Sequence, residues 1–292
     1  MPMAQSDGAR IHYDSFGEGE PVLFLHEFAG DHRSWLDQAR WFARGRRAIC
    51  PAARGYPPSD VPDAADAYGQ RLANADALAV LDALELERAH VVGLSMGAYT
   101  ALQLAIYHPA RVRSVTAAAG GSGAYKPTRD AFIEQTLATA DAIAAAGKMP
   151  VEEMGTTATR IQLLRKDPLG WAQFCANLSE HPATAAANTL RGVQAARPSL
   201  YDLERELAQV EAPVLLLVGD EDEPCLDVNL WLKRIMPTAR LQVMPAAGHA
   251  LNLEEPAAFN AAVEAFLDLV ETGRWRPHDP IAQPGADMYR GR

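Results

Sequence analysis

The stretch AHVVGLSMGAYTALQLAIYHP, residues 89–109, decides the fold of this 292-residue chain. It begins as a short β-branched run typical of a buried strand and continues with the pattern of a helix. Between these two parts, Gly93, Ser95 and Gly97 form the motif G-x-S-x-G, whose glycines permit a sharp turn from strand to helix. Such a turn strains the backbone of Ser95 and lifts its hydroxyl above the sheet. The stretch therefore predicts a nucleophilic serine, with an ordinary glycine-rich turn as the alternative.

Short apolar runs alternate with helical patterns on both sides of this stretch, which favours parallel strands connected by helices. A turn at Asp7-Gly8 opens the chain with antiparallel strands. We therefore predict the α/β class, with a doubly wound, mostly parallel sheet. The expected strands are PVLFLH at 21–26, RRAIC at 46–50, AHVVGL at 89–94, VRSVTAAA at 112–119, APVLLLVGD at 212–220 and RLQVMP at 240–245. The expected helices of the core lie near 70–84, 96–107 and 256–271.

Strand-like runs disappear in the middle of the chain, where the sequence indicates an inserted helical cap at 121–208. The core then comprises 1–120 and 209–271. Residues 272–292 are rich in Pro, Gly and Arg, so we expect an irregular tail that either docks through Trp275 or stays mobile. The helices expected in the cap lie at 128–146, 156–166, 169–178 and 183–196.

Bulk properties exclude several classes of protein. The chain is 48% hydrophobic and carries a net charge of −10, which suits one large globular domain and argues against nucleic acid as a partner. No apolar run is long enough to span a membrane. The start, MPMAQSDGAR, lacks a secretory signal, so we expect a cytoplasmic protein. Cys50, Cys175 and Cys225 are odd in number and widely spaced, which predicts reduced thiols.

A serine hydroxyl needs a base and a carboxylate that orients the base. His249 lies in AAGHALNLEEP, a loop between the last strand and the last helix, which places it at the same edge of the sheet as Ser95. An acidic loop follows the strand VLLLVG. Within it we prefer Asp222 over Asp220, because a G-x-x-D spacing carries the side chain off the strand and toward the base.

The segment HEFAGDH at 26–32 contains residues that often bind metals, namely His26, Glu27, Asp31 and His32. The spacing differs from H-E-x-x-H, in which two histidines one helical turn apart face the same way. We therefore expect no metal site there and no cofactor elsewhere.

Taken together, these motifs resemble the α/β-hydrolase family, in particular its capped, esterase and enol-lactonase-like branch. The resemblance covers about residues 20–271 and is carried by the order Ser95, Asp222, His249 together with GLSMG, HEFAG, ARGYPPSD and GHALNLEEP. It implies an oxyanion hole formed by the backbone N–H groups of Phe28 and Met96.

One residue departs from the family pattern. The loop usually reads H-G-x-x-G, whereas Glu27 here replaces the first glycine. A carboxylate aimed at the oxyanion would oppose catalysis, so we expect Glu27 to point away and pair with Arg54, supporting the loop beside His26. A solvent-exposed Glu27 without a partner is the alternative.

The combined prediction is a serine hydrolase that cleaves a small apolar ester or lactone through an acyl-enzyme on Ser95. The same triad serves carbon–carbon bond hydrolysis and perhydrolysis, and a ligand-binding receptor with slow or absent turnover is an alternative from a different class. A homodimer is compatible with the sequence. The cap residues expected to line an apolar pocket are Phe132, Ile133, Met149, Met154, Trp171 and Phe174.

Overall fold

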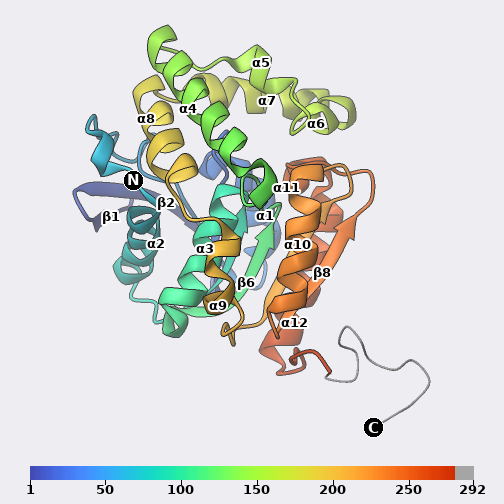
Figure 1. Cartoon of the computed structure of the whole chain (residues 1–292). Helices are drawn as coiled ribbons and strands as arrows, with labels where there is room; N and C mark the ends of the chain where they lie inside the picture. Colours follow the sequence, from blue (N-terminus) through green and yellow to red (C-terminus); the bar gives the residue numbers. More distant parts are fainter. Residues whose placement is uncertain (280–292) are drawn as a thin grey trace.

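The core of the protein is an eight-stranded sheet in the order β1-β2-β4-β3-β5-β6-β7-β8 (Figure 1). The structure is a computed structural model that describes residues 1–279. The part of the expected tail at 280–292 therefore lies outside the described residues. The pairs β1–β2 and β2–β4 are antiparallel, and all the others are parallel. The strands are β1 Met3–Ser6, β2 Ala9–Phe16, β3 Pro21–Leu25, β4 Arg47–Pro51, β5 Ala89–Leu94, β6 Val112–Ala118, β7 Val214–Gly219 and β8 Ala239–Met244. The predicted fold class is therefore confirmed.

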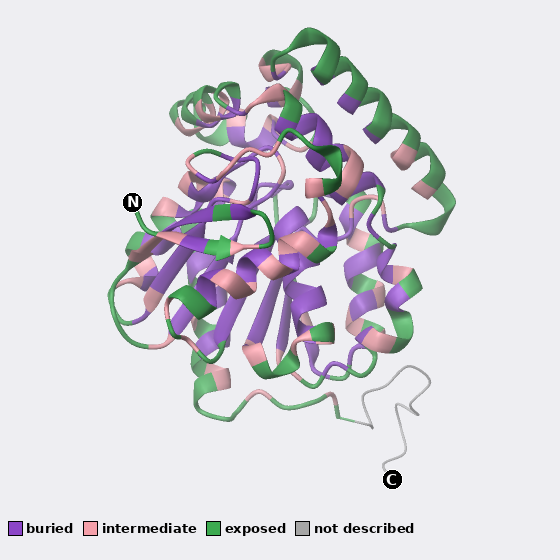
Figure 2. Cartoon of the chain, turned by 90° about the vertical axis from the view of Figure 1, so that its left-hand side faces the viewer, coloured by how far each residue is buried: buried purple, intermediate pink, exposed green. Residues whose placement is uncertain are grey.

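The central strands β3, β5 and β7 are buried along their whole length because helices cover both faces of the sheet. Alternate side chains of β3 show this: Leu23 packs into one hydrophobic cluster, and Phe24 into the cluster on the opposite face. Helices α2, α3 and α10 cover the first face, and α1 and α12 the second. Figure 2 shows the strands buried between helices whose outer faces are exposed. These helices are α1 Leu36–Phe42, α2 Gln70–Ala83, α3 Met96–Tyr107, α10 Glu223–Ile235 and α12 Pro256–Glu271.

The segment between β6 and β7, which we call the insertion (residues 121–208), contains helices and no strand among its described residues. Its helices α4 to α8 lie together beyond one end of the sheet, at the top of Figure 1. They bury a small core of their own, which also takes in Ala29 from the loop after β3. The helices of this region are α4 Arg129–Ala146, α5 Val151–Gly155, α6 Ile161–Lys166, α7 Pro168–Ser179, α8 Ala183–Thr189, a π-helix Leu190–Ala195 and α9 Glu204–Leu207.

Two of the helices predicted in the insertion differ from the observed ones. The helix expected at 156–166 is shorter, because 156–160 form turns and α6 begins only at Ile161. The helix expected at 183–196 changes to π geometry after Thr189. Short π-helical turns that interrupt an α-helix are frequent at functional sites.

The chain beyond α12 docks onto the core within the described residues. The indole N–H of Trp275 donates to the carbonyl of Thr238 at 2.8 Å, and its ring meets Phe266 edge-on at 4.6 Å between centroids. Of the two expectations for this segment, docking through Trp275 is therefore the one observed up to residue 279. No described helix is both long and apolar enough to cross a membrane.

Candidate active site

Ser95 occupies a strained turn between β5 and α3. Its φ of 52° and ψ of −106° lie in a region that residues other than glycine rarely adopt. The turn requires its two glycines, because a Cβ at Gly93 would lie 2.2 Å from the carbonyl oxygen of Gly97, and one at Gly97 would lie 2.0 Å from that of Leu25. The motif therefore has the geometry that the sequence predicts, with Ser95 at the positive end of the dipole of α3.

Asp222 and His249 meet although 26 residues separate them in the chain. The Nδ1 atom of His249 lies 2.9 Å from Oδ2 of Asp222, and both residues are buried. Burial alone would lower the pKa of His249, but the attraction of the Asp222 carboxylate and the hydrogen bond to it hold this pKa well above its ordinary value. Because Nδ1 is hydrogen-bonded to the carboxylate, Nε2 is the nitrogen that is available to accept a proton from another group.

Ser95 and His249 line the same cavity, which has a volume of about 290 Å³. The loops that carry them follow β5 and β8, both parallel strands, so both loops leave the carboxyl edge of the sheet. The structure thus brings the predicted serine and histidine to one cavity, with the aspartate behind the histidine.

The neighbouring acid Asp220 has a different role. Its Oδ1 accepts a hydrogen bond from the backbone N–H of Ala247 at 3.1 Å, and the residue is exposed. This contact ties the loop after β7 to the loop that carries His249. The preference for Asp222 as the partner of His249 therefore agrees with the contacts.

His26 connects the loop after β3 to the segment at 53–60. Its Nε2 accepts a hydrogen bond from the backbone N–H of Ala53 at 3.0 Å, so Nδ1 carries the proton and donates to the carbonyl of Glu27 at 2.7 Å. Burial lowers the pKa of His26 to about 4, which keeps the ring neutral. The hydroxyl of Tyr56 donates to the carbonyl of Phe28 at 2.7 Å. These bonds fix the backbone around Phe28.

The predicted pairing of Glu27 with Arg54 is wrong. Glu27 is buried and forms an ion pair with Arg160 of the insertion, while Arg54 binds Asp76 of α2 through two nitrogens at 2.7 and 2.6 Å. The alternative of an exposed Glu27 is wrong as well. Asp76 offers Arg54 a bidentate carboxylate, and Glu27 turns instead toward the cavity, where Arg160 neutralises its charge.

Sequence reasoning missed two residues of the site. One is Arg160, which packs over the ring of Phe174 at 4.8 Å and lines the cavity next to Glu27. The other is Glu254, whose carboxylate accepts hydrogen bonds from the backbone N–H groups of Gly248 at 2.5 Å and Ala250 at 2.9 Å. These two amides flank His249, and the available signal was the acid five residues after the histidine in HALNLEEP.

The lining of the cavity is more polar than expected. Of the apolar residues predicted there, Phe132 and Met154 line it, whereas Met149 and Phe174 are buried in the core of the insertion. Three threonines and a glutamine from the insertion complete the wall: Thr136, Thr157, Thr159 and Gln194.

Cys225 lies beside this site without lining the cavity. Its Sγ donates to the carbonyl of Ala119 at 3.4 Å and lies 3.3 Å from Oγ of Ser122. Burial and the nearby Asp222 raise the pKa of its thiol, so it is a packed, protonated side chain. All three cysteines are free thiols, as the sequence predicts.

A strained serine turn at the carboxyl edge of a mostly parallel sheet, under a helical insertion, is an arrangement typical of α/β enzymes. The model of the family described as alpha/beta hydrolase fold matches residues 20–256. The chain therefore belongs to the α/β-hydrolase family.

Similar proteins are named as hydrolases of several kinds. The chain is 31% identical to a 2-hydroxy-6-oxo-6-phenylhexa-2,4-dienoate hydrolase of Burkholderia cepacia, over 88% of this chain and 91% of the relative. It is 29% identical to 3-oxoadipate enol-lactonase 1 of Acinetobacter baylyi, over 86% of this chain and 89% of the relative. A solved structure described as an N-acyl homoserine lactone degrading enzyme matches with a TM-score of 0.74 and 31% identity, covering 91% of this chain and all 100% of that chain. The chain is thus an enzyme of a hydrolase family whose members cleave different bonds.

Proposed function

We propose that the protein is a serine hydrolase that cleaves a small carboxylic ester or lactone through an acyl-enzyme on Ser95. The single observation that carries the proposal is the shared cavity of Ser95 and His249, with Asp222 hydrogen-bonded to the far side of the imidazole at 2.9 Å. A weak alcohol placed beside an oriented base is the arrangement that acyl transfer requires.

In the first step, Oγ of Ser95 attacks the carbonyl carbon while Nε2 of His249 accepts the hydroxyl proton. The C–O bond to the leaving alcohol then breaks, and the imidazolium returns the proton to that alcohol, which stays attached to the acyl group when the substrate is a lactone. In the second step, water gives a proton to Nε2 of His249 and attacks the acyl carbon. The bond between Oγ of Ser95 and that carbon then breaks, and the imidazolium returns the proton to Oγ, which releases the acid and restores the serine hydroxyl. Asp222 holds the imidazole orientation and stabilises its positive charge throughout.

The negative charge on the carbonyl oxygen needs hydrogen-bond donors. We assign this role to the backbone N–H groups of Met96, which opens α3, and of Phe28, whose carbonyl is anchored by Tyr56. The first N–H groups of a helix have no acceptor within the helix. Removing one such donor typically costs about 3 kcal/mol of transition-state stabilisation.

The wall of the cavity supports a small or medium substrate with one polar end. Its volume is about 290 Å³, and Phe132, Met154 and Leu190 supply apolar surface. Arg160 lines the same cavity, and its Nε has no hydrogen-bond partner within residues 1–279. A polar oxygen of the substrate would satisfy that donor.

Carbon–carbon bond hydrolysis is the second candidate, favoured by the 31% identity to a dienoate hydrolase. It would use the same serine and histidine, but the leaving group would be a carbanion rather than an alcohol, and the proton returned by His249 would go to carbon. A receptor with slow turnover is the third reading, and no contact in the site favours it.

The decisive experiment is a substrate panel with the purified protein. The panel contains p-nitrophenyl acetate and butyrate, a γ-lactone and a β-diketone, and mass spectrometry tests for an acyl adduct on Ser95. We expect ester or lactone turnover that is lost in Ser95→Ala, with the matched control Ser122→Ala, which alters another serine of the cavity wall, retaining most of it. Equal activity in Ser95→Ala and wild type would refute the mechanism, and turnover of the β-diketone alone would favour the second candidate.

A further inference from the structure

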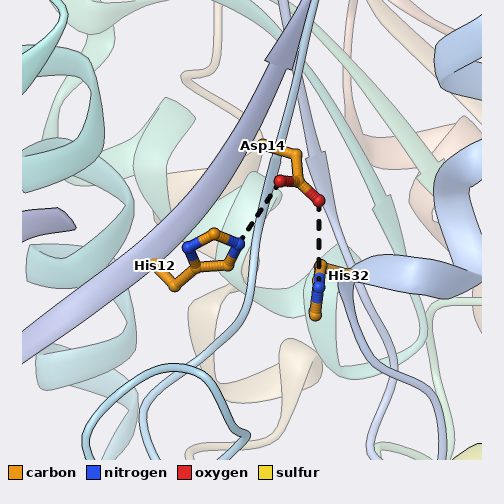
Figure 3. Close-up of side chains that lie close together, drawn as sticks. All are labelled: His12, Asp14 and His32. Atoms are coloured by element: carbon orange, nitrogen blue, oxygen red, sulfur yellow. Dashed lines mark ion pairs between the residues drawn. The ribbon is translucent and has the colours of Figure 1, made fainter. Parts of the chain in front are cut away.

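A second cluster of chemically active side chains lies outside the cavity of Ser95. His12 and Asp14 belong to β2, and His32 opens the short 3-10 helix η1, His32–Trp35, after β3. One ligand atom from each of these residues lies within 4.8 Å of the other two. We propose that His12, Asp14 and His32 form a binding site for one divalent transition-metal ion of the Zn²⁺ type (Figure 3).

The local structure explains how the three residues meet. His12 and Asp14 are two positions apart in a strand, so their side chains project from the same face of the sheet. The loop after β3 then brings η1 back over that face. Both imidazoles present Nε2 to the same carboxylate: His12 Nε2 lies 3.3 Å from Oδ1 of Asp14, and His32 Nε2 lies 3.8 Å from Oδ2 (Figure 3).

These separations suit a tetrahedral ion. Metal–ligand bonds of about 2.1 Å place neighbouring ligand atoms roughly 3.4 Å apart. The separation between His12 and Asp14, 3.3 Å, is close to that value, and the one between His32 and Asp14, 3.8 Å, is longer. The two rings meet edge to face, at 79° with centroids 5.3 Å apart, so they are not stacked on one another. A small rotation of the His32 ring would bring its Nε2 to the distance expected between two ligands of one ion.

The other ring nitrogen of each histidine, Nδ1, also faces an oxygen, as it does in histidines that bind metals. In known sites the second nitrogen of a ligating histidine faces an oxygen, which orients the ring. Nδ1 of His12 lies 3.2 Å from the carbonyl of Pro2, and Nδ1 of His32 lies 3.8 Å from Oδ1 of Asp31. The latter nitrogen is buried and without a hydrogen-bond partner in the described chain, so a turn of the ring toward a bound ion would break no hydrogen bond there.

The chemistry of the cluster selects the kind of ion. Two imidazoles and one carboxylate favour Zn²⁺, Co²⁺ or Ni²⁺ over Mg²⁺ and Ca²⁺, which prefer oxygen ligands. The imidazoles are buried, whereas the side chain of Asp14 is 31% exposed and leaves a path for the ion. A neutral imidazole is the form that binds metals.

A bound ion would fasten β2 to η1, next to the loop at 26–30. None of the three ligands lines the cavity of Ser95. The site would therefore stabilise the fold near the loop at 26–30 and take no part in the proposed hydrolysis, and the inference does not depend on the proposed function.

The test measures binding of Zn²⁺ to the full chain by equilibrium dialysis after treatment with a chelator, with Mg²⁺ and Ca²⁺ as comparison ions. We expect one Zn²⁺ per chain and a rise in Tm of about 5 °C at Zn²⁺ well above its Kd. Asp14→Asn and His32→Gln should lose both effects, while His108→Gln, which alters a histidine elsewhere on the chain, should keep them. Binding that is absent in wild type, or unchanged in both ligand variants, overturns the proposal.

A second measurement uses only the wild-type protein, so it does not depend on whether a variant folds. Nitrogen-15 NMR follows the imidazole signals during titration with Zn²⁺. We expect the Nε2 signals of His12 and His32 to shift at one equivalent, while that of His249 stays in place. Shifts confined to other histidines would count against the site.

Discussion

Asp222 and His249 form a buried hydrogen bond, Oδ2 to Nδ1 at 2.9 Å, between two loops at the same edge of the sheet. A carboxylate in this position stabilises the protonated imidazole more than the neutral one, which is why it holds the pKa of His249 well above 6.5 despite burial. The pair therefore gives the imidazole both its orientation and its basicity.

The first prediction concerns the pH dependence of turnover. His249 must be neutral to accept the serine proton, so kcat should fall as the pH drops through the pKa of His249. Because that pKa is raised, the acidic limb of kcat/KM should have its midpoint above 6.5, the ordinary value for histidine. Initial rates measured between pH 5 and pH 10 give the midpoint of this limb. A midpoint below 6 would contradict the assignment of His249 as the base.

The second prediction concerns Asp222 itself. Asp222→Asn should lower kcat by about 10⁴-fold, because an amide neither stabilises the imidazolium nor enforces the correct tautomer. The acidic limb should move to lower pH, since the attraction that raises the pKa is lost. Asp220→Asn is the matched control, because the carboxylate of Asp220 accepts its hydrogen bond from the backbone of Ala247 and not from His249. Equal losses in the two variants would mean that the loop, rather than the pair, was disturbed.

The sheet, Ser95 and His249 can be predicted from the sequence because the patterns that indicate them are local. A buried strand, a glycine turn and a helix lie side by side around Ser95, and His249 stands in a loop between the last strand and the last helix. The partner of Glu27 has no local signal, because Arg160 lies 133 residues away on a different layer. Likewise, His12 and Asp14 look like ordinary strand positions until the loop after β3 places His32 over them.

The third prediction addresses the ion pair between Glu27 and Arg160. Both side chains are almost completely buried, so removing one partner leaves an uncompensated charge. Arg160→Met should lower the free energy of unfolding by about 3–5 kcal/mol. The double variant Glu27→Gln with Arg160→Met should recover most of that loss, because no charge then remains.

Chemical denaturation of the wild type, both single variants and the double variant yields the coupling free energy of the pair. Arg191→Met is the matched control, since Arg191 pairs with Asp141 at the exposed surface of the insertion. Additive losses in the double variant would show that Glu27 and Arg160 do not stabilise one another.

The last prediction concerns Glu254, which acts on His249 only through the backbone. Its two carboxylate oxygens accept the N–H groups of Gly248 and Ala250, so the histidine between them is held from both sides. In Glu254→Gln one acceptor becomes a donor that faces a backbone N–H, and the loop must shift. Because proton transfer depends on geometry within a fraction of an ångström, kcat should fall about 10- to 100-fold while KM changes little. Glu255→Gln is the control: Glu255 pairs with Lys166 near the surface, and its loss should leave kcat within about twofold of wild type. A rise in KM with unchanged kcat in Glu254→Gln would show that this carboxylate shapes the substrate pocket rather than the base.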